Sequence, residues 1–333
     1  MALIISKSGV RRLFGCLASV ALTACGGGGS STPAVVATVT PYPASLVKNT
    51  AGLGVLIVQS EGAQVQIEQA FFAPFLQGFV NASTGGSGSG SASCAVAGVG
   101  SGSLSNTVTK SGTYSGLRAG DSINLTFTSC SFGTATLVLN GSATITPKNN
   151  YASLPAAYLL QYDLKTTNFD ITYSGAKFRS TGLQSVTFDA TAAGETLPEI
   201  NVTAGSGGYS SSYFSPAAAV SANLTYALGS GGTIYSKVSA GNNFTYGVNG
   251  NVNATSGLST LPYIIVTNTR LTGNSASGSP VPSAGNVSAK NTALNLQTVT
   301  AIQGLNATVQ ADTNQDGTLD STTTYSYLAL IAP

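Results

Sequence analysis

The sequence predicts a predominantly all-β protein, built as an antiparallel sandwich, a barrel or a large curled sheet, with one amphipathic helix near the N-terminal end of its folded part. Three observations predict this class. The 333 residues include 40 glycines and only 7% charged residues, a composition that supplies turns and pleated faces and lacks the charges of helical bundles. Apolar and polar residues alternate with a period of two over much of the chain after residue 94. Turn signals separate many of these alternating runs.

The alternating runs are predicted to be half-buried strands. In the run 122–128, for example, Ile123, Leu125 and Phe127 alternate with polar residues. The other runs are 136–145, 158–164, 169–173, 186–190, 224–228, 244–248 and 305–311, and turns are predicted at Ser174-Gly175, Gly231-Gly232, Ala240-Gly241, Asn249-Gly250 and Thr272-Gly273. Short pieces recur at Leu139-Asn140-Gly141, Thr167-Asn168-Phe169 and Thr267-Asn268. They follow no strict period, so a solenoid or a propeller is not predicted.

One helix is predicted at about residues 64–80, because apolar residues recur there at helical spacing. Pro74 predicts a kink, or a helix that starts later than the pattern suggests. The apolar stripe is typical of a helix that covers or plugs a β core, or of one that lies on a membrane surface or docks a partner. Its polar positions are glutamines with one Glu68 and no Lys or Arg, which favours the core. The apolar run 53–58 is predicted to be a buried strand or the start of the folded domain.

The N-terminal segment has the parts of a secretory signal. Lys7, Arg11 and Arg12 form a positive region, residues 13–22 form a mostly apolar stretch, and the small residues Thr23 and Ala24 follow. The apolar stretch has only ten residues, whereas a membrane-spanning helix needs about 20. We therefore expect cleavage and export, and not a transmembrane anchor.

The stretch Leu22-Thr23-Ala24-Cys25 resembles the lipobox of bacterial lipoproteins, which has Leu, two small residues and then Cys. The resemblance implies cleavage between Ala24 and Cys25, diacylglycerol on the Cys25 thiol, and acylation of the new amino terminus by a fatty acid such as palmitate. Several acyl chains on one residue give stable membrane anchoring. The alternative is an ordinary signal peptide that is cut elsewhere and leaves Cys25 as a passive thiol.

The resemblance also implies an organisation and a location. Residues 1–24 are the expected signal peptide, 25–46 a lipidated, flexible Gly/Ser/Thr/Pro-rich tether, and 47–333 the β-rich domain. Gly26, in place of Asp after the cysteine, is similar to the pattern that sorts lipoproteins to the outer membrane. The expected location is therefore the cell outer membrane, with membrane lipid as a partner through acylated Cys25 and the domain facing the periplasm or the cell surface.

The four cysteines divide into three groups. Cys16 leaves with the signal, Cys25 is the lipidation site, and Cys94 and Cys130 remain as a pair in an oxidising compartment. We predict a disulfide between Cys94 and Cys130. Two free thiols or a zinc site are the alternatives, but the chain has no histidine and no further thiol to complete a zinc set.

The run 312–320 resembles the calcium loops of EF-hands and of the related dockerin and thrombospondin type 3 repeats. The matching ligands are Asp312, Asn314, Asp316, the carbonyl of Thr318, and Asp320, with Gly317 at the sharp turn. Thr323 departs from the pattern, since EF-hands have a bidentate Glu there. The flanking runs 305–311 and 321–331 are typical of two strands and not of two helices. The loop is therefore a candidate calcium site, and the alternative is a polar hairpin turn without an ion.

Composition excludes several function classes. Without histidine, Ser-His-Asp and Cys-His catalysis and His-ligated metal centres are excluded. Three of the 13 basic residues belong to the expected signal, which leaves ten against 11 acidic residues. This balance gives no electrostatic footprint for nucleic acid. Two-carboxylate glycoside hydrolysis is still open, and the candidate acids are Asp163, Asp170, Asp189, Glu195 and Glu199.

Three functions remain. The first is a non-catalytic structural or binding module of the envelope, with no catalytic residues and a glycan, lipid or protein as ligand. The second is an envelope enzyme that acts on glycans or lipids through carboxylates. The third is a carrier of an apolar ligand in a half-open barrel, with the predicted helix as its lid or plug. A groove lined by Tyr with two facing acids would favour the second, and an apolar cavity beneath the helix the third.

Overall fold

The computed structural model describes residues 40–94, 100–132, 137–155, 157–173, 176–191, 198–215, 222–239, 243–255, 260–274 and 281–332. These residues belong to one compact unit that spans Val39–Pro333. The expected signal peptide, the lipobox with Cys25 and residues 25–39 of the expected tether lie outside the described residues.

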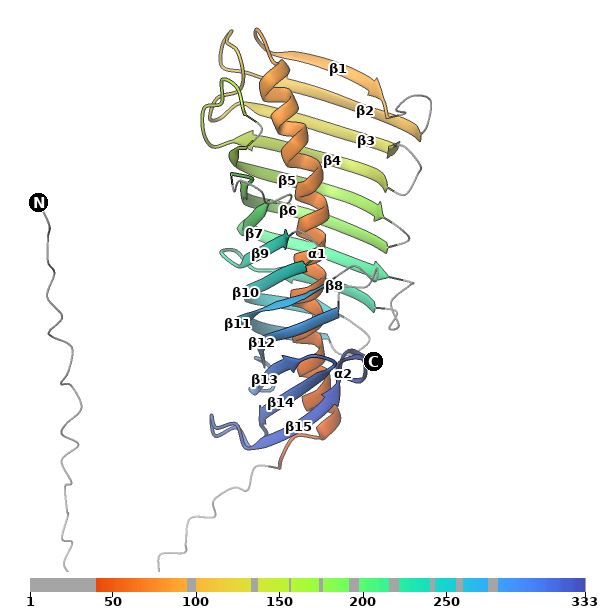
Figure 1. Ribbon diagram of the computed structural model, residues 1–333, viewed down its shortest axis with the longest axis vertical. Coiled ribbons are helices and arrows are strands. Elements are labelled where there is room, and N and C mark those ends of the chain that lie inside the picture. Colours follow the sequence, from red (N-terminus) through yellow and green to blue (C-terminus); the bar gives the residue numbers. More distant parts are fainter. Residues whose placement is uncertain are drawn as a thin grey trace, which may run out of the picture. The chain divides into compact units, whose positions relative to one another are not determined.

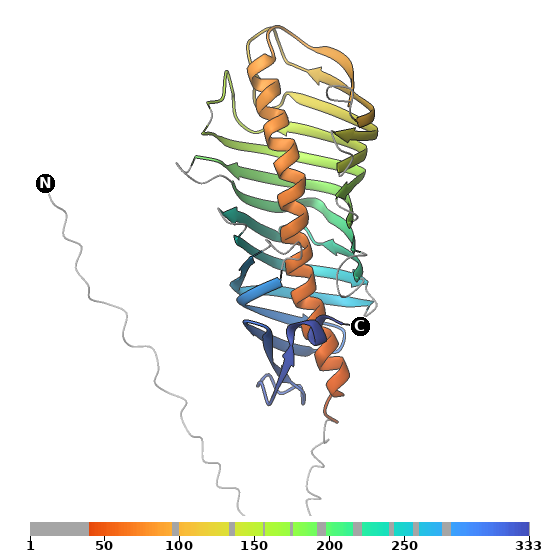
Figure 2. The same ribbon diagram turned by 45° about the vertical axis from the view of Figure 1, so that its right-hand side comes forward.

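A single long helix, α1 (Ala44–Ala82), crosses the strands of the sheet (Figures 1 and 2). It has 39 residues and extends well beyond the predicted helix at its N-terminal end. The predicted strand at 53–58 is wrong, because these residues form the third and fourth turns of α1. Leu53, Val55, Ile57 and Val58 are all fully buried, so the helix here is apolar on every side and shows no helical period. No helix among the described residues is long and apolar enough to be a candidate for crossing a membrane.

The rest of the unit is one antiparallel sheet of fifteen strands, as the all-β prediction requires. Nearly every strand pairs with its neighbours in the sequence, so the chain builds the sheet hairpin by hairpin. The strands are β1 (Gly88–Ser93), β2 (Gly100–Thr109), β3 (Ser122–Phe132), β4 (Leu137–Pro147), β5 (Leu159–Tyr173), β6 (Ala176–Asp189), β7 (Glu199–Ser215), β8 (Ala222–Leu228), β9 (Thr233–Ser239), β10 (Asn243–Thr255), β11 (Thr260–Asn274), β12 (Val281–Asn291), β13 (Leu296–Gln303), β14 (Asn306–Asp312) and β15 (Ser321–Ser326).

Strands β8 and β9 lie end to end between β7 and β10, so together they occupy one row, that is, one strand position, of the sheet. β8 pairs with the C-terminal part of β7 and β9 with its N-terminal part, and β10 pairs with both in the same way. The predicted turn at Gly231-Gly232 lies between them, but it interrupts a row and does not reverse the chain. Fifteen strands therefore make fourteen rows, of which β1 and β15 are the two edges among the described residues. Of the three predicted architectures, the structure has the large curled sheet.

The predicted turn at Gly231-Gly232 is present in the structure. The predicted turns at Asn249-Gly250 and Thr272-Gly273 are wrong, because the first lies within β10 and the second within β11. The turns at Ser174-Gly175 and Ala240-Gly241 lie outside the described residues. All eight predicted alternating runs fall in strands to within one residue at their ends, apart from residue 136, which lies outside the described residues. The runs 158–164 and 169–173 belong to the single strand β5. The last predicted strand, 321–331, is β15 followed by the short helix α2 (Tyr327–Ile331).

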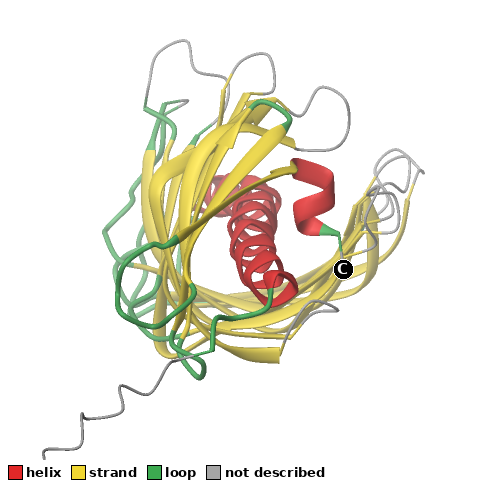
Figure 3. Cartoon of the chain, turned by 90° about the horizontal axis from the view of Figure 1, so that it is seen from below, coloured by secondary structure: helices red, strands yellow, loops and turns green. Residues whose placement is uncertain are grey.

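The sheet curls around α1, which lies on its concave side with α2 beside it (Figure 3). A line of β-bulges crosses β2 to β7 at one level and bends each strand there. Its members have positive φ angles: Gly102, Ser129, Gly141, Asn168, Gly182 and Gly208. At Gly141, with a φ of 105°, a Cβ would lie 2.2 Å from the carbonyl oxygen of Asn168 in the next strand. The bend therefore needs glycine there.

The predicted disulfide between Cys94 and Cys130 is confirmed. It joins the residue after β1 to β3, with a Cα–Cα distance of 5.3 Å, and so crosses over β2. Both cysteines are buried. The bond ties the edge strand β1 into the sheet, close to the bulge of β3.

Candidate functional sites

The first candidate site is a buried polar face of α1, which consists of Glu61, Gln64, Gln66, Glu68 and Gln69. None of these side chains is more than 9% exposed, and both glutamates are 0% exposed. They face the inner side of the sheet, where an apolar core would be the usual filling. Buried polar groups of this kind need hydrogen-bond partners, since each one without a partner costs about 1–3 kcal/mol.

The glutamines of this face bind side chains from β5, β7 and β9. Gln64 donates to the Tyr209 hydroxyl over 2.6 Å and accepts from Ser211. Gln69 accepts from the Tyr162 hydroxyl over 2.5 Å. Ser236 donates to the Gly62 carbonyl over 2.8 Å and to Gln66 over 3.1 Å.

Glu68 is hydrogen-bonded to side chains of β6, the strand between β5 and β7. Ser180 donates to its carboxylate over 3.0 Å and Gln184 over 3.2 Å. Burial raises the pKa of Glu68 from 4.5 to about 7, although these two hydrogen bonds act in the opposite direction. Glu68 therefore changes its charge close to neutral pH.

Glu61 is the unusual member of the face. Among the described residues, neither oxygen of its buried carboxylate has a hydrogen-bond partner. Burial raises the pKa of Glu61 well above its ordinary value, and the negative charge of Glu68 raises it further. A charged carboxylate without partners is costly in such surroundings, so the protonated form is the stable one. Sequence reasoning did not single out Glu61, although Glu61, Gln64 and Glu68 follow the i, i+3, i+7 spacing of one helix face.

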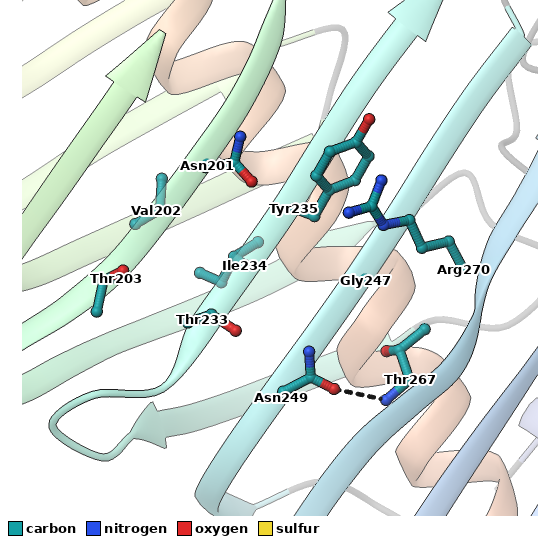
Figure 4. A pocket seen from close by; sticks show the side chains of 10 residues that line it. All are labelled: Asn201, Val202, Thr203, Thr233, Ile234, Tyr235, Gly247, Asn249, Thr267 and Arg270. Carbon is teal, nitrogen blue, oxygen red and sulfur yellow. Dashed lines mark hydrogen bonds between the residues drawn. The ribbon is translucent and has the colours of Figure 1, made fainter. Parts of the chain in front are cut away.

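The second candidate site is a hollow of about 270 Å³ on the outer side of the sheet, beside the gap between β8 and β9 (Figure 4). Its lining is mostly polar and comes from β7, β9, β10 and β11: Asn201, Val202, Thr203, Thr233, Ile234, Tyr235, Gly247, Asn249, Thr267 and Arg270. The Arg270 guanidinium lies 3.2 Å from the centre of the Tyr235 ring. Stacking of this kind holds the guanidinium plane and leaves its N–H edges able to bind an anionic group.

Two of the candidate acids meet near this hollow. Asp189 and Glu199 are directly opposed across β6 and β7, and Glu199 accepts from Asn201 over 3.4 Å. Hydrogen bonds from Thr191 lower the pKa of Asp189, which keeps it ionised.

The remaining candidate acids are not brought together. Asp163 pairs with Lys148 over 3.0 Å, and Asp170 pairs with Arg179 over 2.6 Å. Glu195 lies outside the described residues. The Asp189–Glu199 pair is therefore the arrangement that the glycan-active alternative would have to use.

The third candidate site is the loop 312–320 between β14 and β15. Its polar side chains cap the backbone of the loop itself: Asp312 accepts from Gly317 N–H, Asn314 from Asp316 N–H, Asp316 from Thr318 N–H, and Asp320 from Thr313 N–H. Hydrogen bonds from the side chain of Thr318 to Asp316 and from that of Thr313 to Asp320, together with those from the same residues' backbone N–H groups, lower the pKa values of these two acids. The described residues contain no group of three or more acidic, histidine or cysteine side chains that could hold a metal ion.

One oxygen of this loop is nevertheless unused. Asp312 is 3% exposed, and its Oδ1 is buried without a hydrogen-bond partner among the described residues.

Comparisons of the chain with protein-family models, curated proteins and solved structures give no match. Arguments about function therefore rest on the residues themselves.

Proposed function

We propose that this chain is a lipid-anchored lipoprotein of the bacterial outer membrane, and that its β-rich domain is a non-catalytic structural or binding module that faces the periplasm or the cell surface. The lipobox Leu22-Thr23-Ala24-Cys25 supports the anchor. The observation that supports a non-catalytic module is the position of α1. This helix occupies the concave side of the curled sheet (Figure 3), where a fold of this shape would otherwise hold a substrate.

Binding would then take place on the outer side of the sheet. The hollow beside β9 offers hydroxyl and amide groups together with the stacked Arg270. This lining suits a polar ligand that carries an anionic group, such as an acidic glycan.

The two alternatives have less support. A glycosidase of the two-carboxylate type needs one protonated acid and one ionised carboxylate. The hydrogen bonds from Thr191 hold the pKa of Asp189 below its ordinary value, so Asp189 suits only the second role, and no feature of the structure assigns the first to Glu199. A carrier needs an apolar space beneath the helix. The side of α1 that faces β5 to β9 instead carries Gln64, Gln66, Gln69 and Glu68, which are hydrogen-bonded to the sheet.

Replacing Cys25 by Ala is expected to abolish acylation. Wild-type protein, expressed from the full chain in a Gram-negative host, should sediment with the membranes and have a mature mass that starts at Cys25 and includes the acyl chains. The Cys25→Ala protein should lose the acyl mass and leave the membrane fraction. Cys16→Ala is the matched control, because Cys16 lies in the expected signal and its loss should change neither result. A wild-type protein whose mass contains no acyl chains would refute the anchor.

Calcium binding at 312–320 is a second candidate function, favoured by the buried, unpartnered Oδ1 of Asp312. A hard cation would give this oxygen a partner, with Asn314, Asp316, the Thr318 carbonyl and Asp320 as the other ligands. Calcium at about 100 times its dissociation constant should then stabilise the protein by about 2.7 kcal/mol. The measurement is the thermal unfolding midpoint with calcium and with chelator. The shift should disappear in Asp312→Asn and persist in the control Asp163→Asn, and equal midpoints in wild type would remove the site.

A further inference from the structure

The sheet has two open edges among the described residues. β1 pairs only with β2, and β15 pairs only with β14. Their sequences, Gly-Ser-Gly-Ser-Ala-Ser and Ser-Thr-Thr-Thr-Tyr-Ser, contain no charged residue and no proline. Natural proteins commonly use Lys or Pro to stop an edge from pairing with another chain. Both edges therefore leave backbone N–H and C=O groups ready for a further strand.

The number of rows makes these two edges compatible. Every neighbouring pair is antiparallel, so with fourteen rows β1 and β15 run in opposite directions. A second copy can be placed with its β1 beside β15 and its α1 on the same side of the sheet. Its β1 then runs antiparallel to β15, and the alternation continues from one copy into the next. An odd number of rows would have produced a parallel junction.

The two ends are also complementary in their apolar surface. Leu305 and Leu328 are 76% and 50% exposed, and the hydrogen bond from Tyr327 N–H to the Leu305 carbonyl places them at the C-terminal end of β15. At the start of β1 there is a hollow of about 250 Å³, lined by Phe79 and Val108 together with residues of the segments 82–90 and 106. In an antiparallel pair, the end of β15 meets the start of β1.

We propose that copies of this chain associate head to tail, with β15 of one copy pairing with β1 of the next and the exposed leucines seated in the hollow beside Phe79. A contact between two different surfaces of the same molecule does not close on itself in this arrangement, so it generates an open stack. The proposal does not depend on lipid anchoring or on any ligand of the outer hollow.

The pleat of the sheet limits the register of the junction. Gly88 is opposite the buried Val108 and Thr323 is opposite the buried Val309, so even-numbered residues of β1 and odd-numbered residues of β15 point to the inner side. Opposed residues of neighbouring strands share a face. Ser91, which points outward, must therefore stand opposite Thr322 or Thr324, and not opposite Thr323.

Cysteine cross-linking of the full chain tests this geometry. The variants are Ser91→Cys with Thr322→Cys, and Ser91→Cys with Thr324→Cys, each oxidised in solution and run on a non-reducing gel. We expect a ladder of dimers, trimers and larger species from one of them. Ser91→Cys with Thr323→Cys is the matched control, because these side chains point to opposite faces and cannot meet disulfide geometry. Each single-cysteine variant should give no ladder.

The outcomes separate the possible occupants of the edge. A ladder that needs both cysteines in one chain supports the head-to-tail junction. Dimers from Thr322→Cys or Thr324→Cys alone would mean that β15 pairs with β15 of a second copy, and would overturn the proposal. No ladder from either double variant, in a protein whose far-UV circular dichroism matches wild type, would mean that another segment or partner covers an edge, and would also overturn it.

Discussion

Replacing Glu61 by Gln is expected to stabilise the protein at pH 8 and to leave its stability at pH 4 nearly unchanged. A carboxyl group whose pKa is higher in the folded state than in the unfolded state binds its proton more tightly when folded. It costs no stability below the unfolded pKa and destabilises increasingly as pH rises through the folded pKa. Burial and the charge of Glu68 raise the pKa of Glu61 well above its ordinary value, so wild type should lose stability as pH rises from about 4.5.

Glu68 sets the scale of this effect. Its pKa is raised from 4.5 to about 7. This difference lowers the free energy of unfolding by about 3 kcal/mol as the pH rises between those two values. Glu61→Gln replaces a carboxyl group that the folded protein holds protonated with a neutral amide, which loses no proton when the chain unfolds at pH 8. We therefore expect a gain of several kcal/mol at pH 8 in the variant.

The measurement is urea unfolding followed by circular dichroism at pH 4, 6 and 8. Glu199→Gln is the control, since Glu199 is an outward-facing acid on β7 and its replacement should change stability by less than about 0.5 kcal/mol at each pH. If wild type and Glu61→Gln lose stability in parallel between pH 4 and 8, the carboxylate is not buried in the way that the structure places it.

The sequence was informative where the inner face of a strand carries large apolar residues. β3 and β5 were predicted because Ile123, Leu125, Leu160 and Leu164 point inward and are buried. β13 was missed for the opposite reason. Its inward residues include Thr298 and Thr300, at 0% and 1% exposed, and its outward residues include Val299 and Ala301, so neither face is clearly apolar or polar. Small inward residues are needed where α1 lies close to the sheet, and they hide the period of two.

The line of bulges is marked in the sequence by recurring Asn-containing pieces, but these pieces alone did not predict bulges. Leu139-Asn140-Gly141, Thr167-Asn168-Phe169 and Thr267-Asn268 recur without a period, and all three lie at bulges of β4, β5 and β11. Gly141 and Asn168 have positive φ angles, which Gly and Asn adopt more readily than other residues, and this explains the first two of these positions. Asn249-Gly250 has the same composition and was predicted as a turn, because a bulge and a turn demand the same backbone freedom.

The polar face of α1 could be predicted in part. Its glutamines were recognised and correctly favoured a helix on the core, but a single chain does not show which strands supply their partners. Tyr162, Tyr209 and Ser236 lie between 93 and 170 residues away from the helix side chains that they bind. The outer hollow was not predictable for a related reason, since four different strands line it and none has a motif of its own.

Replacing Gly62 by Ala is expected to destabilise the protein, although alanine favours helix by about 1 kcal/mol over glycine. A Cβ at residue 62 would lie 2.2 Å from Cγ of Tyr246 and 2.6 Å from its Cβ. These atoms are close to the backbone of β10, so the tyrosine cannot swing away and α1 must shift as a whole. Overpacking of this kind costs about 1–3 kcal/mol, and the same shift would stretch the neighbouring bond from Ser236 to the Gly62 carbonyl.

Gly78→Ala is the matched control on the same helix. Nothing lies within 4 Å of a Cβ at residue 78, so here the helix propensity of alanine acts alone and the protein should become more stable by up to about 1 kcal/mol. The two variants should therefore move the urea midpoint in opposite directions, with similar slopes of free energy against urea. If Gly62→Ala stabilised the protein as Gly78→Ala does, α1 would not lie against β10, and the burial of Glu61 beside it would fall as well.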